Sequence, residues 1–110
     1  MMKAIYYTQT GVSKEVLKVG NFKIPNLKNN EVLLQMEYSS VNPADTKKRS
    51  GWLGVDLNKE FIIPHSDGVG TVVEVGNLID KKILGKKFWV CGGSKDKQFG
   101  TCAEFFLTNI

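Results

Sequence analysis

The pattern of apolar and polar residues along this chain is mostly that of short β-strands. Residues 3–8 and 16–22 are two such runs, rich in apolar, β-branched and aromatic residues, and a polar turn at 10–13 separates them. Two runs joined by a turn of this kind are typical of an antiparallel hairpin. We therefore expect the chain to open with a hairpin, followed by a loop over 24–30.

The next run, over residues 31–40, is the longest. Val32, Leu34, Met36 and Tyr38 stand at alternate positions and would share one face of a strand. Leu33 breaks the alternation, because it places an apolar side chain on the opposite face. This third strand is therefore expected to be central in its sheet and covered on both faces.

One short helix is predicted directly after this third strand. Asn42 suits the cap position, Pro43 the first helical position, and Asp45 is a carboxylate near the helix amino end. Gly51 suits the end of the helix. Residues 52–61 are then expected to form an irregular loop.

Strand patterns return in the second half of the chain, over 70–75, 87–90 and 101–107. Turn residues separate them, notably Gly76-Asn77 and Gly92-Gly93. Many short strands with a single helix predict a mainly β fold, a small and partly open β-barrel. With 110 residues the chain suits one compact domain over 1–110.

Charge and composition narrow the function. The net charge is +4, but the lysines are dispersed in pairs and the aromatic residues lie within strand patterns, so we expect no nucleic-acid partner. The amino terminus turns polar quickly, which predicts neither a signal peptide nor a membrane anchor. Cys91 and Cys102 are read as small buried hydrophobes in a reducing compartment, so a cytoplasmic protein is expected.

His65 is the only histidine, and Ser66 and Asp67 follow it. We expect no hydrolytic triad, because consecutive residues of an extended segment point to alternate faces.

Gly68-Val69-Gly70 begins like a dinucleotide fingerprint, but Val73 takes the place of the third glycine. These glycines are expected to permit a close turn or a bulge instead.

Several segments along nearly the whole chain carry a family resemblance through their order and spacing. They are Met2-Lys3-Ala4-Ile5, Glu31-Val32-Leu33-Leu34, Val41-Asn42-Pro43-Ala44-Asp45, residues 64–76, Gly85-Lys86-Lys87-Phe88 and Gly100-Thr101-Cys102-Ala103-Glu104-Phe105. The set resembles the amino-terminal catalytic domain of the medium-chain dehydrogenase/reductase family, in its zinc-independent quinone oxidoreductase branch. The resemblance implies a GroES-like domain of the alcohol dehydrogenase amino-terminal type.

The same resemblance implies that no zinc is bound. Asn42, Ser66 and Asp67 stand where zinc-dependent relatives have a cysteine and a histidine-glutamate pair, and His65 lies one place too early to be the ligand histidine. Two soft zinc ligands are thus replaced by weakly binding side chains. The cysteine cluster of a structural zinc site is missing as well.

For the complete enzyme the resemblance implies hydride transfer from NADPH to a quinone or enone. A Rossmann domain, in cis or in trans, would hold most of the cofactor, and this sequence contains no Gly-x-Gly-x-x-Gly. Asn42 would orient the carbonyl or the cofactor, Ser66 and Asp67 would line the nicotinamide side, and Lys47 would offer positive charge to the developing enolate. Without the Rossmann domain we expect the domain to fold but not to turn over.

Two readings from other functional classes stay open. The barrel is similar to that of co-chaperonins, ring-forming subunits with a mobile loop, for which residues 51–61 would be the candidate. A non-catalytic interaction module is the other. Residues 105–110 are mostly apolar, so self-association into a homo-oligomer is also compatible with the sequence. The co-chaperonin reading gives no role to the Asn42 and Ser66-Asp67 segments.

Overall fold

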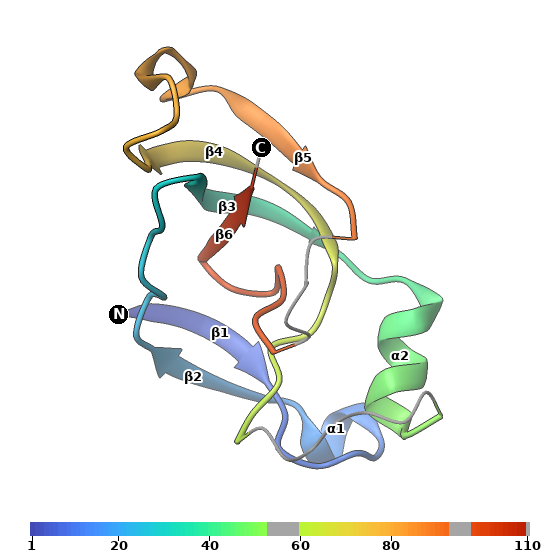
Figure 1. The fold of residues 1–110 in the computed structure, drawn as a ribbon. Helices are drawn as coiled ribbons and strands as arrows, with labels where there is room; N and C mark the ends of the chain where they lie inside the picture. The colour runs from blue at the N-terminus through green and yellow to red at the C-terminus, as the bar shows by residue number, and fades with distance from the viewer. Residues whose placement is uncertain (53–59, 93–97, 110) are drawn as a thin grey trace.

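The computed structural model describes residues 1–52, 60–92 and 98–109. Figure 1 shows a mainly β chain with helical ribbon beside the strands. The elements in chain order are β1 (Met2–Tyr6), α1 (Ser13–Val16), β2 (Lys18–Phe22), β3 (Glu31–Ser40), α2 (Pro43–Ser50), β4 (Asp67–Val75), the 3-10 helix η1 (Lys81–Ile83), β5 (Lys87–Val90) and β6 (Phe105–Asn109).

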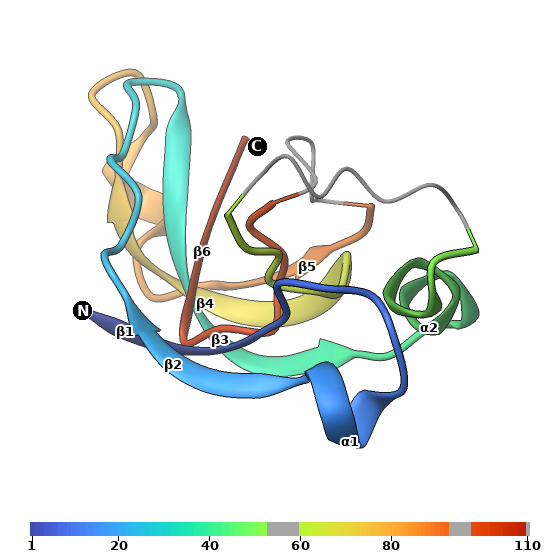
Figure 2. The same cartoon turned by 90° about the horizontal axis from the view of Figure 1, so that it is seen from below.

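The strands form two antiparallel sheets. β1 and β2 make a hairpin, and the other sheet has the order β5-β4-β3-β6. Seen from below in Figure 2, the two sheets curve around a common interior without closing into a complete ring. The expected partly open barrel, with its helix after the third strand, is confirmed.

β3 is central in its sheet, as its sequence pattern predicted. Val32 and Leu34 have no exposed surface and lie in one core cluster with Val72, Val90 and Phe106. Leu33 is also buried, on the other face of the strand. A second cluster, around Met2, Ala4 and Ile63, fills the space beside the hairpin.

Glycines let β4 approach β3 closely. A Cβ on Gly68 would lie 2.5 Å from the Tyr38 carbonyl oxygen, and one on Gly70 would lie 2.8 Å from that of Gln35. The pairing also shifts register between Met36 and Tyr38, which is the expected bulge. These glycines thus serve sheet packing within β4, and no dinucleotide loop forms there.

The sequence analysis did not predict the short helices α1 and η1. α1 occupies part of the predicted turn and takes Val16 from the predicted strand over 16–22, because the Val16 N–H bonds the Val12 carbonyl at 3.1 Å. Val16 is nonetheless buried against Tyr7 and Ile62. An apolar residue can be buried from either structure, so its hydrophobicity did not decide between them. The last strand also starts later than expected, at Phe105 rather than at residue 101.

Two side chains expected inside strand patterns are on the surface, and so is one cysteine that was expected to be buried. Tyr38 is 75% exposed and Trp89 is 88% exposed. Trp89 alternates with Phe88, which packs against the core, and with buried Val90, so it must point outward. Cys91 is also exposed and unpaired, which corrects the expectation that both cysteines are buried.

Among the described residues, no helix has the length and apolar character needed to span a bilayer.

Candidate functional site

The sheet register brings Asn42 and Asp67 together. β3 and β4 are antiparallel and pair Ser40 with Asp67, so the end of β3 and the start of β4 lie at the same edge. Asn42 follows β3 by two residues. Its Nδ2 donates to Asp67 Oδ2 at 2.7 Å. Two residues that are 25 positions apart in the sequence thus form one polar pair.

Both oxygens of the Asp67 carboxylate accept hydrogen bonds from within the protein. Oδ2 accepts from Asn42, and Oδ1 accepts from the Gly92 N–H at 2.9 Å. A carboxylate held by two donors is fixed in orientation. Asp67 therefore acts on the site mainly by holding Asn42 and the backbone at Gly92.

Asn42 combines a structural role with outward-facing polar capacity. It begins α2 in a capping box with Asp45, whose Oδ2 accepts the Asn42 backbone N–H at 2.7 Å. Because Asp67 can only accept, the side-chain nitrogen of Asn42 must face it. In the capping box Oδ1 faces the Asp45 backbone N–H, and the second amide N–H has no partner among the residues described, so the side chain can still donate to a ligand.

Lys47 and Ser66 lie apart from this pair. Lys47 is exposed on α2, and Ser66 is half-buried at the entrance to β4. Within the described part of the chain, no hydrogen bond or ion pair connects either side chain to Asn42 or Asp67. The structure therefore brings two of the four candidate residues together, and the functional roles of all four remain predictions.

A hydrogen-bond network beside the pair was not predicted. Ser39 Oγ lies 2.7 Å from His65 Nδ1 and 3.0 Å from Thr101 Oγ1. Thr101 Oγ1 donates to the backbone carbonyl of Asp67 at 2.8 Å. Thr101 has no exposed surface, although a threonine is usually a surface residue. Only this burial, which no sequence pattern shows, marks it as part of the site.

The segment 63–65 that leads into the site is clasped by residues 100–102. Backbone hydrogen bonds run from Gly100 to Ile63, from Thr101 to His65 and from Cys102 to Pro64, at 2.8, 3.0 and 3.1 Å. His65 has a φ of 78°, the only positive value among the described non-glycine residues. This conformation, and not the extended one assumed from sequence, turns its ring toward Ser39 and away from a triad with Ser66.

Burial is the main cause of the pKa shifts of His65, Cys102 and Tyr7. Burial lowers the pKa of His65, and the charge of Asp45 opposes this only in part. Burial also raises the pKa of the Cys102 thiol and of the Tyr7 hydroxyl. At neutral pH these groups are therefore neutral: the imidazole is unprotonated, and the thiol and phenol keep their protons.

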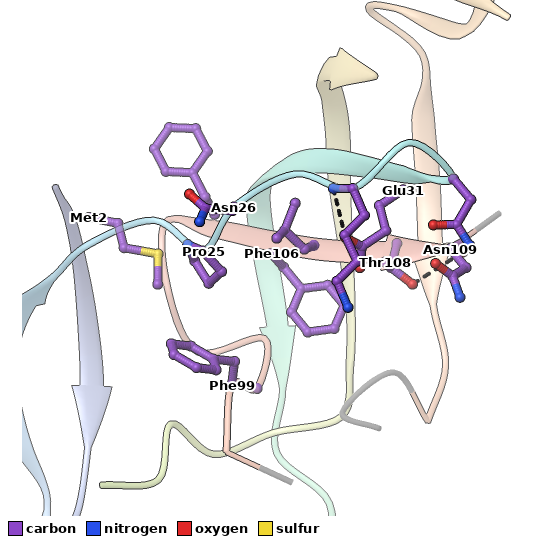
Figure 3. A pocket seen from close by; sticks show the side chains of 13 residues that line it. Met2, Pro25, Asn26, Glu31, Phe99, Phe106, Thr108 and Asn109 are labelled. Carbon is purple, nitrogen blue, oxygen red and sulfur yellow. Dashed lines mark hydrogen bonds between the residues drawn. The ribbon is translucent and has the colours of Figure 1, made fainter. Parts of the chain in front are cut away.

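Two cavities lie near the sheet ends. The one in Figure 3, of about 410 Å³, lies between the 25–31 loop and β6, where Phe99 and Phe106 meet Asn26 and Thr108. None of the four candidate residues lines it. A shallower groove of about 440 Å³ is lined by Asp67 and Ser39 together with the exposed rings of Tyr38 and Trp89. A third groove, of about 430 Å³, is lined by Ser39 and Thr101, so two grooves adjoin the polar network.

In the described part of the chain, no three His, Cys, Asp or Glu side chains are grouped so that they could hold a metal ion. The polar groups at the site are an amide, hydroxyls, one imidazole and a carboxylate already bound by two donors. Such a set suits hydrogen bonding to a small organic ligand.

The sequence is similar to several plant reductases. It is 31% identical over 109 residues to an NADPH-dependent alkenal/one oxidoreductase of Arabidopsis thaliana, covering 94% of this chain and 28% of that protein. It is 33% identical to the 2-methylene-furan-3-one reductase of Solanum lycopersicum, with the same coverage of 94% and 28%.

The fold matches solved oxidoreductases. The quinone oxidoreductase from Coxiella burnetii superposes with a TM-score of 0.87 at 28% identity, covering 98% of this chain and 34% of that one. The mitochondrial 2-enoyl thioester reductase heterodimer from Candida tropicalis gives a TM-score of 0.77 at 26% identity, covering 98% and 31%.

This chain thus spans about 30% of the length of the proteins it matches. The match is to their amino-terminal part. The profile of the alcohol dehydrogenase GroES-like domain covers residues 28–108. Together with the antiparallel sheets and the helix after β3, this match shows that the chain belongs to the alcohol dehydrogenase GroES-like domain family and resembles the amino-terminal part of quinone and alkenal oxidoreductases.

Proposed function

We propose that this chain is the substrate-side domain of an NADPH-dependent, zinc-independent quinone or enone oxidoreductase. The observation that carries the proposal is the hydrogen bond between Asn42 and Asp67, which fixes a neutral amide with one free N–H donor at a sheet edge. The reductase names of the relatives support the substrate class. Bound NADPH would supply the hydride.

The residues of this chain would bind and orient the acceptor. The free N–H of Asn42 would donate to the carbonyl oxygen that gains negative charge during reduction, which stabilises that charge. Asp67 would hold the amide in place, and Ser66 would line the nicotinamide side. Lys47, exposed and without an ion pair in the described structure, would contribute positive charge near the enolate.

Zinc has no part in this proposal. Reduction by hydride transfer needs an oriented carbonyl and a donor for the developing charge, and an amide provides the donor. We further propose that turnover requires a Rossmann domain, because no dinucleotide-binding glycine pattern exists in this sequence.

A chimera tests the proposal directly. Residues 1–110 would replace the matching amino-terminal third of the Coxiella burnetii quinone oxidoreductase, and NADPH oxidation would be followed with a quinone and with an enone, with and without a chelator. We expect turnover that the chelator leaves unchanged, and no turnover from the chain alone. A folded chimera that binds NADPH but reduces neither acceptor would contradict the proposal.

Variants of the chimera test the residue roles. Asn42→Ala should lower kcat/KM about tenfold, which corresponds to about 1.4 kcal/mol of transition-state stabilisation. Lys47→Met should lower it as well, while the matched control Lys81→Met, on η1, should not. Equal losses for the two lysine variants would remove Lys47 from the site.

The co-chaperonin alternative predicts rings of the isolated chain. The loop proposed for it, over 51–61, falls largely outside the described residues, which include only 51, 52, 60 and 61 of it. Sedimentation of the purified chain separates the two functions: a defined ring of several subunits would favour the chaperone reading, and a monomer or dimer would not.

A further inference from the structure

The proton inventory of the Ser39 network fixes the tautomer of His65. The Asp67 carbonyl can only accept, so the single hydroxyl proton of Thr101 is committed to it. Thr101 Oγ1 can then only accept from Ser39, which uses the one proton of Ser39. Ser39 Oγ must in turn accept from His65 Nδ1, so Nδ1 carries the ring proton.

The other ring nitrogen is therefore a bare acceptor. In the described part of the chain, Nε2 of His65 makes no hydrogen bond, and every buried side-chain nitrogen or oxygen there has a partner. Nε2 must accordingly reach solvent. The lowered pKa of His65 keeps this nitrogen unprotonated at neutral pH.

The backbone also holds this ring in place. His65 keeps a left-handed φ of 78°, which a non-glycine residue adopts only at a cost, and its carbonyl is bonded by the Thr101 N–H. The network that begins at the ring ends on Asp67, whose side chain orients Asn42. His65 and Asn42 thus stand at the two ends of one hydrogen-bonded chain, and each keeps polar capacity free.

We propose that His65 is a ligand-binding residue of this site, whose Nε2 accepts a hydrogen bond from the hydroxyl group of a reduced ligand such as a hydroquinone or an enol. This rests on the function proposed above. A quinone offers only acceptor oxygens and cannot bond Nε2, whereas a hydroquinone offers O–H donors. Asn42 can donate to the oxidised carbonyl, so the two residues would recognise the two oxidation states of the same ligand.

Nitrogen NMR of the 110-residue chain tests the tautomer without ambiguity, because the chain has one histidine. Long-range proton–nitrogen spectra at pH 8 should show the proton on Nδ1. In Thr101→Val, Ser39 loses its acceptor and can donate to Nδ1, so the proton should move to Nε2. The control Ser40→Ala removes a neighbouring hydroxyl and should change nothing. A proton on Nε2 in the unmodified chain would overturn the proposal.

Ligand binding is tested in the same spectra by titration with a hydroquinone and with its dimethyl ether, which has no O–H. Only the hydroquinone should shift the Nε2 resonance. His65→Gly suits the positive φ, so it should remain folded, and it should bind the hydroquinone about three- to tenfold more weakly, as expected for one lost hydrogen bond. No shift with the hydroquinone, or equal shifts with both compounds, would refute the role of His65.

The proposed function fails independently of this inference. A chimera that reduces quinones while the hydroquinone leaves Nε2 unmoved would refute only the role of His65. An inactive chimera with a clear and selective Nε2 shift would refute only the reductase assignment.

Discussion

The substitution Gly100→Ala should damage the site by forcing apart two backbone segments. A Cβ on Gly100 would lie 2.2 Å from the Pro64 carbonyl oxygen and 2.4 Å from those of Ile63 and His65. Contacts this short with backbone atoms cannot be relieved by a side-chain rotation. Segment 63–65 must therefore move away, and with it His65 and the residues that enter β4.

The size of the effect follows from what the movement breaks. Three backbone hydrogen bonds connect residues 100–102 to 63–65, and each contributes about 0.5 to 1.5 kcal/mol to stability. We expect a loss of about 2 to 4 kcal/mol, a large share of the roughly 5 to 15 kcal/mol typical of a domain. At about 4 °C per kcal/mol for a domain near this size, Tm should fall by roughly 8 to 16 °C.

The assay is urea unfolding followed by far-UV circular dichroism, with Gly85→Ala as the control. Gly85 has a φ of 82° and open space around its Cβ position, so alanine there carries only the conformational cost of about 1 to 2 kcal/mol. Comparing the two variants separates the stability lost to steric conflict at Gly100 from the stability lost to an unfavourable backbone conformation at Gly85. If Gly100→Ala lost no more stability than Gly85→Ala, the close approach described for Gly100 would be wrong.

Three further outcomes are expected. Leu34→Ala should cost about 3 to 5 kcal/mol, because Leu34 has no exposed surface, whereas Leu78→Ala, at a side chain 76% exposed, should cost less than about 0.5 kcal/mol in the same unfolding assay. His65 has a lowered pKa in the folded state, so the unfolded chain binds more protons and the free energy of unfolding should fall as pH drops below about 6.5, a slope that His65→Gly should flatten. Iodoacetamide should alkylate exposed Cys91 before Cys102, whose pKa is raised by burial, and mass spectrometry of peptides would show the reverse order if the burial of Cys102 were incorrect.

Local patterns predicted the elements that depend on near neighbours in sequence. The alternation around Leu33 placed β3 at the centre of its sheet, and the order Asn42, Pro43, Asp45 located α2. The prediction of a simple turn at 10–13 was wrong, because a helical turn and a β-turn use the same polar residues. The local sequence is compatible with a helical turn and with a β-turn. The helical turn forms because it allows Val16 to pack against Tyr7 and Ile62.

Only part of the candidate site could be predicted from the sequence. Asn42 and Asp67 could be named because family-typical segments contain them. The partnership of Ser39 with Thr101, 62 positions away, depends on how β3 and residues 100–102 meet in space. Tyr38 and Trp89 illustrate the same difficulty, since a strand pattern gives alternation but does not say which face meets solvent.

The clasp between 63–65 and 100–102 also sets when the site can form during synthesis. β1 bridges to Ala103, and β6 pairs with β3, so the first strand must wait for about the last tenth of the sequence. At ribosomal speeds of about 5 to 20 residues per second, that delay is roughly 5 to 20 s. Until then Met2 and Ala4 have Ile63 but lack the cover that Cys102, Ala103 and Phe105 provide, and a nascent chain stalled before residue 100 would leave them partly exposed to chaperones.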